Sequence, residues 1–159
     1  MALEIERKFL IKNASYRDMS CGSAEIVQGY ICRNPERVVR IRKFGDEAFV
    51  TFKGKNRGIA GLEFQYPLPL ADFEPLLSLC QPPVIRKTRY FVDYEGKRWE
   101  VDEYHGQLEP LVTAEVELVS SDEKVILPAF VGREVSEDPR YCNSNLGLGN
   151  PERSCQGAD

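Results

Sequence analysis

The chain has 159 residues, of which 42% are hydrophobic and 29% charged, and its formal net charge is −4. This length fits a single domain with a substantial core, and an acidic chain lacks the basic surface that usually leads nucleic-acid binding. No apolar run approaches the ~20 residues that span a bilayer, and no signal-peptide pattern opens the chain. We therefore expect a cytoplasmic protein without nucleic-acid or membrane partners.

Alternation of apolar and polar residues predicts strands along most of the chain. Gly45-Asp46 and Gly96-Lys97 indicate two tight hairpin turns between neighbouring strands. The eight expected strands cover residues 3–11, 24–32, 37–44, 47–53, 62–69, 84–95, 98–104 and 111–119.

Helical periodicity is scarce. The segment ADFEPLLSLC (71–80) has apolar residues at helical spacing and ends before Pro82-Pro83. The segment SSDEKVILP (120–128) is interpreted as a second short helix. The sequence contains no internal repeat or linker. It predicts one mainly β (α+β) domain over residues 1–149, with helices in the connections and at the C-terminus, and a loose tail over 150–159.

Charged residues recur at every second position of these strands, and residues i and i+2 of a strand share a face. The charges are segregated by sign, whereas a water-facing surface usually mixes them. A sheet with one solvated face remains an alternative interpretation. The acidic pairs are Glu4/Glu6, Glu100/Asp102 and Glu115/Glu117, and the basic pairs are Arg40/Arg42 and Lys87/Arg89.

Like charges that converge need counter-ions. At about 4 Å and an effective dielectric constant of ~20, a like-charged pair costs on the order of 4 kcal/mol. Acidic clusters call for a hard divalent cation, and basic clusters call for phosphate. A closed eight-stranded antiparallel β-barrel has an interior that can hold one small ligand. The pattern permits such a tunnel with charged side chains inside and apolar side chains outside.

The opening segment EIERKFL resembles the start of CYTH-domain proteins, the triphosphate tunnel metalloenzymes. This family shares an antiparallel eight-stranded tunnel and acts on a triphosphate group with a divalent metal. The chain looks most like the small bacterial members that hydrolyse inorganic tripolyphosphate. Further fragments follow in family order to about residue 149: VRIRK, TFK, LEFQY, KTRY, WEVDEY, AEVEL and GREVSEDPRYCNSNLG.

The resemblance implies a role for each charged position. Catalytic roles fall to Lys8, Asp102 and Glu63, with Asp102 positioning water or holding a second ion. The implied metal ligands for Mg²⁺ or Mn²⁺ are Glu4, Glu6, Glu115, Glu117, Asp102 and Glu100. The implied phosphate-binding residues are Lys8, Arg40, Arg42, Lys53, Lys87 and Arg89.

One position departs from the family pattern. Glu63 matches the first acid of a family pair, but the second acid is replaced by Gln65. An amide keeps a hydrogen-bonding oxygen and loses the negative charge. The substitution leaves open how position 65 affects metal binding.

The resemblance predicts hydrolysis of tripolyphosphate to pyrophosphate and orthophosphate. A class IV adenylate cyclase and a thiamine or nucleoside triphosphatase would use the same tunnel and stay open as alternatives. A non-catalytic polyphosphate- or nucleotide-binding domain is a further alternative, supported by Gln65 alone. The sequence does not rank tripolyphosphate against the other triphosphates. It leaves the number of metal ions and the oligomeric state open, a homodimer included.

The remaining reactive side chains predict no other chemistry. Five cysteines form no CxxC pair, which favours free thiols over disulfides or a zinc site. The lone histidine, His105, lies in the turn-like stretch YHGQLEP and is expected to be an exposed loop residue. The segment YCNSNLG (141–147) is expected to dock the C-terminal part of the chain against the barrel.

Overall fold

A computed structural model describes residues 2–148, so the loose tail expected over 150–159 lies outside the described residues. The helices in this range are α1 (Tyr16–Met19) and α2 (Leu70–Leu77), with 3₁₀ turns at Gly106–Leu108 and Pro139–Tyr141. The strands are β1 (Leu3–Ile11), β2 (Gly22–Cys32), β3 (Arg37–Phe44), β4 (Glu47–Gly54), β5 (Ala60–Leu68), β6 (Gln81–Tyr94), β7 (Lys97–Tyr104), β8 (Val112–Glu117) and β9 (Val131–Glu134).

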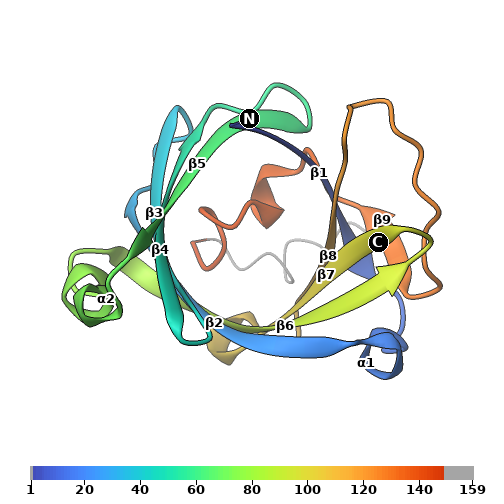
Figure 1. Ribbon diagram of the computed structural model, residues 1–159, viewed down its shortest axis with the longest axis horizontal. Helices are drawn as coiled ribbons and strands as arrows, with labels where there is room; N and C mark the ends of the chain where they lie inside the picture. The colour runs from blue at the N-terminus through green and yellow to red at the C-terminus, as the bar shows by residue number, and fades with distance from the viewer. Residues whose placement is uncertain (1, 149–159) are drawn as a thin grey trace.

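Eight of these strands close into an antiparallel barrel. The strand order is β5-β4-β3-β2-β6-β7-β8-β1, and β1 closes the ring by pairing with β5, with Leu3 opposite Leu62 and Ile5 opposite Ala60. Figure 1 shows these strands arranged in a closed ring. Closure leaves no unpaired strand edge in the ring. The predicted closed eight-stranded barrel is confirmed, and β9 adds a short strand beside β1.

Apolar side chains on the outside of the barrel form two clusters under covering segments. Trp99 is fully buried and packs against Phe9 and Phe130, beneath α1 and the connection from β8 to β9. On another side, Phe73 of α2 packs over Ile41. The outer surface thus supplies much of the hydrophobic core, which frees the inner face for polar side chains.

The two expected helices have different outcomes. The helix expected over 71–80 is present as α2, whereas the helix expected over 120–128 is wrong, because this stretch forms a turn and irregular chain. The Glu123 carboxylate accepts a hydrogen bond from the Val119 backbone N–H at 2.6 Å and forms an ion pair with Lys97 at 3.0 Å. The ion pair with Lys97 of β7 and the packing of Val125 against the cluster around Trp99 hold this stretch against the barrel instead.

The segment after β9 fills one end of the barrel. Tyr141 and Leu146 are buried there with inward-facing Tyr30, Ile85 and Tyr104. In Figure 1 this orange-red segment lies within the ring of strands. The barrel interior is therefore a tunnel with one apolar, closed end. No helix of residues 2–148 is long and apolar enough to cross a membrane.

Candidate functional site

Strand register brings every predicted site residue to the inner face of the barrel. Directly opposed residues of an antiparallel pair share a face, as do residues i and i+2 of one strand. The register can be followed around the ring in neighbouring pairs: Glu6 with Glu117, Lys8 with Glu115, Glu115 with Glu100, Asp102 with Arg89, Lys87 with Ile26, Gln28 with Arg42, Arg40 with Thr51, Lys53 with Glu63, and Glu4 with Gly61.

The acidic wall is formed by Glu4, Glu6, Glu115 and Glu117 on β1 and β8. Burial raises the pKa of Glu4 to about 8, together with its hydrogen bond to Glu63. Burial and the charges of Glu115 and Glu4 raise the pKa of Glu6 well above its usual range. Glu115 is different: burial opposes its ionisation, but the nearby Lys8 ammonium outweighs it and lowers its pKa to about 2. The wall thus holds more carboxyl groups than its cations can balance.

These oxygen donors fit a hard divalent cation in kind. Carboxylate oxygens suit Mg²⁺ and Mn²⁺, and the wall offers no soft ligand. Within residues 2–148, however, no three Asp, Glu, His or Cys side chains are placed to share one ion. Lys53 lies among the acids instead, with Nζ at 3.4 Å from Glu4 and 3.7 Å from Glu63. A bound cation would have to draw the carboxylates together and displace protons or Lys53.

The opposite part of the tunnel is basic. Asp102 is buried between two cations: Arg89 donates to both of its oxygens, at 2.8 and 2.9 Å, and Lys87 Nζ lies 2.8 Å away. Arg89 also donates to Glu100 at 2.8 Å. Burial would raise the pKa of Asp102, but Arg89 and Lys87 hold it well below its usual range. Both Asp102 oxygens are therefore already occupied by cationic donors.

Arg42 is the least compensated cation of this wall. Among residues 2–148 its guanidinium has no ion-pair or hydrogen-bond partner, and its Nε is buried. Burial lowers the pKa of Arg42 to about 9, and the charges of Arg40 and Arg89 add to the shift. A buried guanidinium without an anion is costly, and a phosphate group is a ligand that its planar fork matches. The basic wall is thus electrostatically incomplete without an anion.

Two uncharged inward-facing residues were given no role from the sequence. Gln28 is buried, donates from Nε2 to the Tyr30 hydroxyl at 3.0 Å and leaves Oε1 without a partner among residues 2–148. Thr51 accepts a hydrogen bond from Arg40 at 3.1 Å and donates to Gln65 at 3.2 Å. The i, i+2 spacing from Tyr30 and from Lys53 was the signal that places both side chains inside.

The C-terminal segment reaches into the site through Lys8. Lys8 Nζ donates to the backbone carbonyl of Tyr141 at 2.9 Å and lies 3.4 Å from Glu115. The hydroxyl of Tyr104 donates to Asn143 at 2.8 Å. The docking expected for residues 141–147 therefore occurs, and it holds the Lys8 ammonium against the acidic wall.

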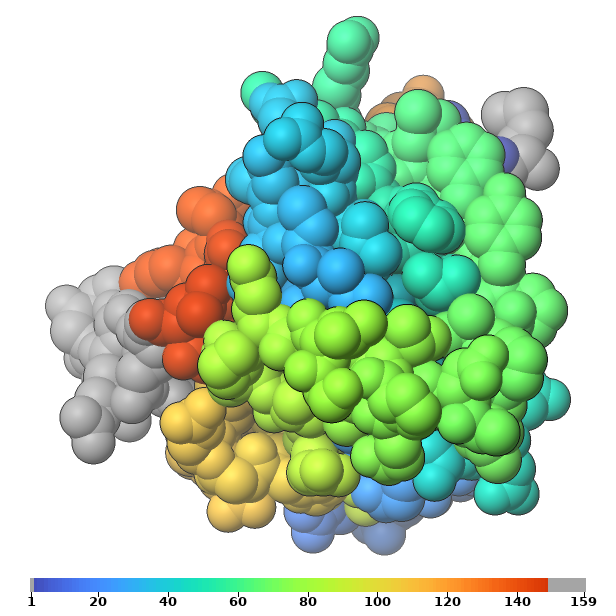
Figure 2. Space-filling model, turned by 90° about the vertical axis from the view of Figure 1, so that its left-hand side faces the viewer, coloured from blue at the N-terminus to red at the C-terminus, as the bar shows by residue number. Residues whose placement is uncertain are grey.

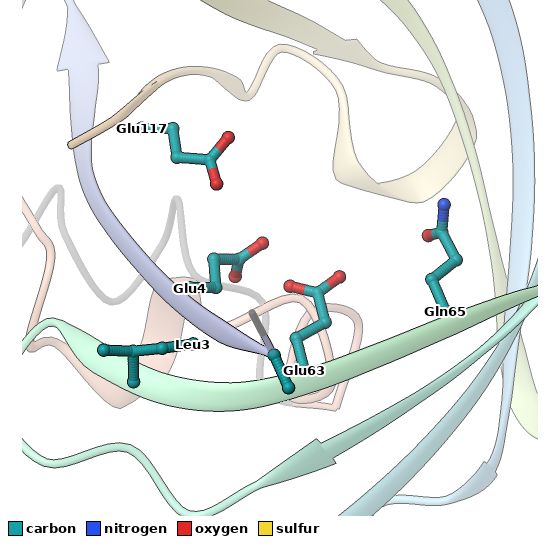
Figure 3. A pocket seen from close by; sticks show the side chains of 6 residues that line it. Leu3, Glu4, Glu63, Gln65 and Glu117 are labelled. Carbon is teal, nitrogen blue, oxygen red and sulfur yellow. The ribbon is translucent and has the colours of Figure 1, made fainter. Parts of the chain in front are cut away.

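The end of the tunnel away from this segment opens through a cavity of about 230 Å³. Figure 3 shows Glu4, Glu63 and Glu117 with their carboxylates directed into this space. Gln65, on the same strand as Glu63, lies apart from these three acids. The cavity is lined by Ala2, Leu3, Glu4, Glu63, Gln65 and Glu117. An anion that enters the tunnel would pass these acids, so a cation at the entrance would ease its entry.

The raised pKa values predict how stability depends on pH. In metal-free buffer, Glu4 and Glu6 keep protons in the folded protein that the unfolded chain loses near pH 4.5. The melting temperature should therefore fall as pH rises from about 4.5 to about 8. Asp102 and Glu115 have lowered pKa values and change the stability only below this pH range. Lys87 has a pKa lowered to about 8 and changes the stability only above this range.

Thermal unfolding measured across this pH range in the presence of a chelator checks the prediction. A Glu4→Gln/Glu6→Gln variant, which cannot release these protons, should show a flatter profile. A wild-type melting temperature that stays constant or rises between pH 5 and 8 would contradict the assignment.

Comparison with known proteins gives a consistent set of similarities. The family model described as CYTH domain matches residues 2–143. An inorganic triphosphatase of Acetivibrio thermocellus is 43% identical over 147 residues, which is 92% of this chain and 94% of the relative. An inorganic triphosphatase of Nitrosomonas europaea is 35% identical over 152 residues, which is 93% of this chain and 99% of the relative. The crystal structure of the inorganic triphosphatase NE1496 superposes with a TM-score of 0.65 at 33% identity, covering 91% of this chain and 97% of that one.

Proposed function

This chain belongs to the CYTH domain family, and we propose that it is a divalent-metal-dependent hydrolase of inorganic tripolyphosphate. Water adds to the phosphorus that is attacked, the bridging P–O bond breaks, and pyrophosphate and orthophosphate leave. One observation carries the proposal. The tunnel, which is closed at one end, has an acidic wall on one side and, on the other, a basic wall whose positive charges are only partly balanced. A triphosphate with a metal ion supplies the charges that both walls lack.

Family membership implies a divalent metal, and we propose Mg²⁺ or Mn²⁺. A metal held by the acidic wall would offset the negative charge that develops on the phosphate oxygens during transfer. The low pKa of Glu115 keeps this ligand ionised without a metal, whereas Glu4 and Glu6 must first release protons. The proposed ligands are Glu4, Glu6, Glu115 and Glu117, with Glu100 beside them.

The proposed role of the basic residues is to hold the phosphate chain. Arginine offers paired donors to phosphate oxygens, while lysine acts as a point charge. Phosphoryl transfer needs chiefly such positioning and charge neutralisation, so the proposed chemistry requires no Ser, Cys or His nucleophile. The proposed phosphate-binding residues are Lys8, Arg40, Arg42, Lys53, Lys87 and Arg89.

Asp102 and Gln65 are proposed as positioning residues. Asp102 orients Lys87 and Arg89 because both of its oxygens face them. Gln65 supports Arg40 through the hydroxyl of Thr51. A role of Asp102 in orienting water or a second ion, and a catalytic role of Glu63, remain predictions from the family resemblance.

We also propose that residues 1–149 form one CYTH-like domain and that the protein acts in the cytoplasm. The substrate is a small-molecule triphosphate. The closed apolar end of the tunnel favours inorganic tripolyphosphate over a triphosphate with a bulky organic group at that end. The space there is already filled by the side chains of Tyr30, Ile85, Tyr104, Tyr141 and Leu146.

A substrate panel tests the proposed activity. Tripolyphosphate, ATP and thiamine triphosphate are each incubated with Mg²⁺ and with Mn²⁺, and the products are separated by ion-exchange chromatography. We expect orthophosphate and pyrophosphate from tripolyphosphate, with activity lost on adding a chelator and restored by excess metal. Cyclic AMP from ATP would favour the cyclase alternative. Tight triphosphate binding by calorimetry without turnover under either metal would favour a non-catalytic binder and overturn the proposal.

A further inference from the structure

One sector of the outer barrel surface is apolar and uncovered by any described residue. The β4–β5 face is defined by five side chains on β1, β4 and β5, each with 43 to 53% of its surface exposed. Figure 2 shows the side chains of β4 and β5, in teal and green, open beside α2. The five residues are Leu3, Phe52, Leu62, Phe64 and Tyr66.

The β4–β5 face is continuous. Leu3 lies opposite Leu62, and Phe52 lies opposite Phe64. The rings of Phe52 and Tyr66 meet edge to face at a centroid distance of 6.4 Å. Two other sectors of the outer face are covered: α2 packs over Ile41, and α1 lies over the cluster around Trp99. The β4–β5 face lacks such cover within residues 2–148.

The size of the β4–β5 face suits the centre of a protein–protein interface. An aromatic side chain presents roughly 200 Å² when fully exposed, so five large side chains about half exposed offer on the order of 400–500 Å². A stable interface buries about 800 Å² on each partner, with a polar rim around an apolar centre. The face would supply that centre, and its neighbours would supply the rim.

The charges at the two ends of β5 are complementary. Arg57 is exposed in the loop before β5, together with Lys55, which already pairs with Glu36 at 3.2 Å, and Asp72 and Glu74 are exposed on α2 after β5. If two copies pack with their β5 strands antiparallel about a two-fold axis, the basic end of each strand meets the acidic end of the other. Residues 149–159 of the printed sequence contain no large apolar side chain, so they do not match this surface chemically.

We propose that a second copy of this chain binds the β4–β5 face and forms a two-fold symmetric homodimer with antiparallel β5 strands at its centre. The interface lies on the outside of the barrel, so each copy keeps a complete tunnel. The homodimer goes beyond the proposed catalytic function, because it depends on the outer face alone.

Sedimentation of the full chain at concentrations from roughly 1 µM to 0.1 mM tests the proposal. We expect a dimer that becomes a monomer in a Phe64→Ser/Tyr66→Ser variant. Ile126→Ser is the matched control, because Ile126 is 61% exposed and lies in the connection from β8 to β9, where Val125 packs against the cluster around Trp99; it should remain dimeric. Thermal unfolding of each variant shows whether the fold is kept. A wild-type chain that is monomeric throughout overturns the proposal and assigns the face to a different partner.

Charge reversal tests the orientation without changing the apolar centre. Lys55→Glu/Arg57→Glu should weaken dimerisation by about tenfold or more at low salt, because acidic ends then meet. Adding Asp72→Lys/Glu74→Lys to the same chain should restore it. Failure of the fourfold variant to recover dimerisation, with its fold intact, overturns the antiparallel arrangement. Tripolyphosphate hydrolysis is measured separately, so loss of activity bears on the tunnel and not on this interface.

Discussion

Replacing Lys8 with methionine is expected to lower tripolyphosphate hydrolysis by at least about 100-fold and to destabilise the protein by about 3–5 kcal/mol. The Lys8 ammonium is buried, donates to the Tyr141 carbonyl and balances Glu115 at 3.4 Å. Methionine keeps much of the side-chain volume and removes the charge. The substitution leaves a buried carboxylate without its cation and removes a phosphate ligand. Phosphate release and urea unfolding in metal-free buffer measure the two effects.

A second substitution separates the two roles of Lys8. In Lys8→Met/Glu115→Gln the buried carboxylate is neutralised, so most of the lost free energy of unfolding should return. Activity should stay low, because both a phosphate ligand and a metal ligand are gone. A Lys8→Met variant that retains activity within a few-fold of wild type would contradict the proposed role.

Arg42→Met is also expected to lower activity, by about 10²–10³-fold, but its free energy of unfolding should be unchanged or higher. The Arg42 guanidinium has no ion-pair or hydrogen-bond partner among residues 2–148, its Nε is buried, and burial has lowered its pKa to about 9. Removing this charge relieves repulsion with Arg40 and Arg89 in the empty tunnel. It also removes the donor that is most available to a phosphate oxygen.

The control for Arg42 lies on the outside of the barrel. Arg17 of α1 pairs with Glu103 of β7 at 2.7 Å, and its side chain is largely exposed. Arg17→Met should leave hydrolysis unchanged and change the free energy of unfolding little. Equal loss of stability in Arg42→Met and Lys8→Met would refute the distinction between an uncompensated and a paired cation. Calorimetry of tripolyphosphate binding without metal should show weaker binding for Arg42→Met.

The barrel could be predicted because its signals are local. The alternation of apolar and charged residues over 37–44 and 98–104 predicts both the strands and the fact that the charged side chains of each strand share one face. Segregation of sign then favours an enclosed face over a solvated one. The strand β9 has only four residues and no alternation, so it gives no comparable signal. The expected helix over 120–128 failed because Glu123 pairs with Lys97 of β7 and Val125 packs against the cluster around Trp99, tertiary contacts that helical propensity does not contain.

The pairing of charges inside the tunnel could not be predicted, because it depends on strand register. A shift of one residue exchanges the faces of a strand, and a shift of two changes every cross-strand neighbour. Asp102 meets Arg89 only because these residues are opposed between β6 and β7. Sequence reasoning assigned Asp102 to the metal and did not foresee its contacts with Arg89 and Lys87. The filled end of the tunnel also depends on a distant segment, which brings Tyr141 to Lys8.

The central claim is that one enclosed face binds a divalent cation and a triphosphate between opposite walls. Crystal diffraction from the protein with Mn²⁺ and a non-hydrolysable imidotriphosphate, recorded with the anomalous signal of manganese, tests it most directly. The account predicts an anomalous peak among Glu4, Glu6, Glu115 and Glu117, with phosphate density beside Arg42. Manganese bound only outside the barrel, or a tunnel without phosphate density at saturating ligand, would contradict it.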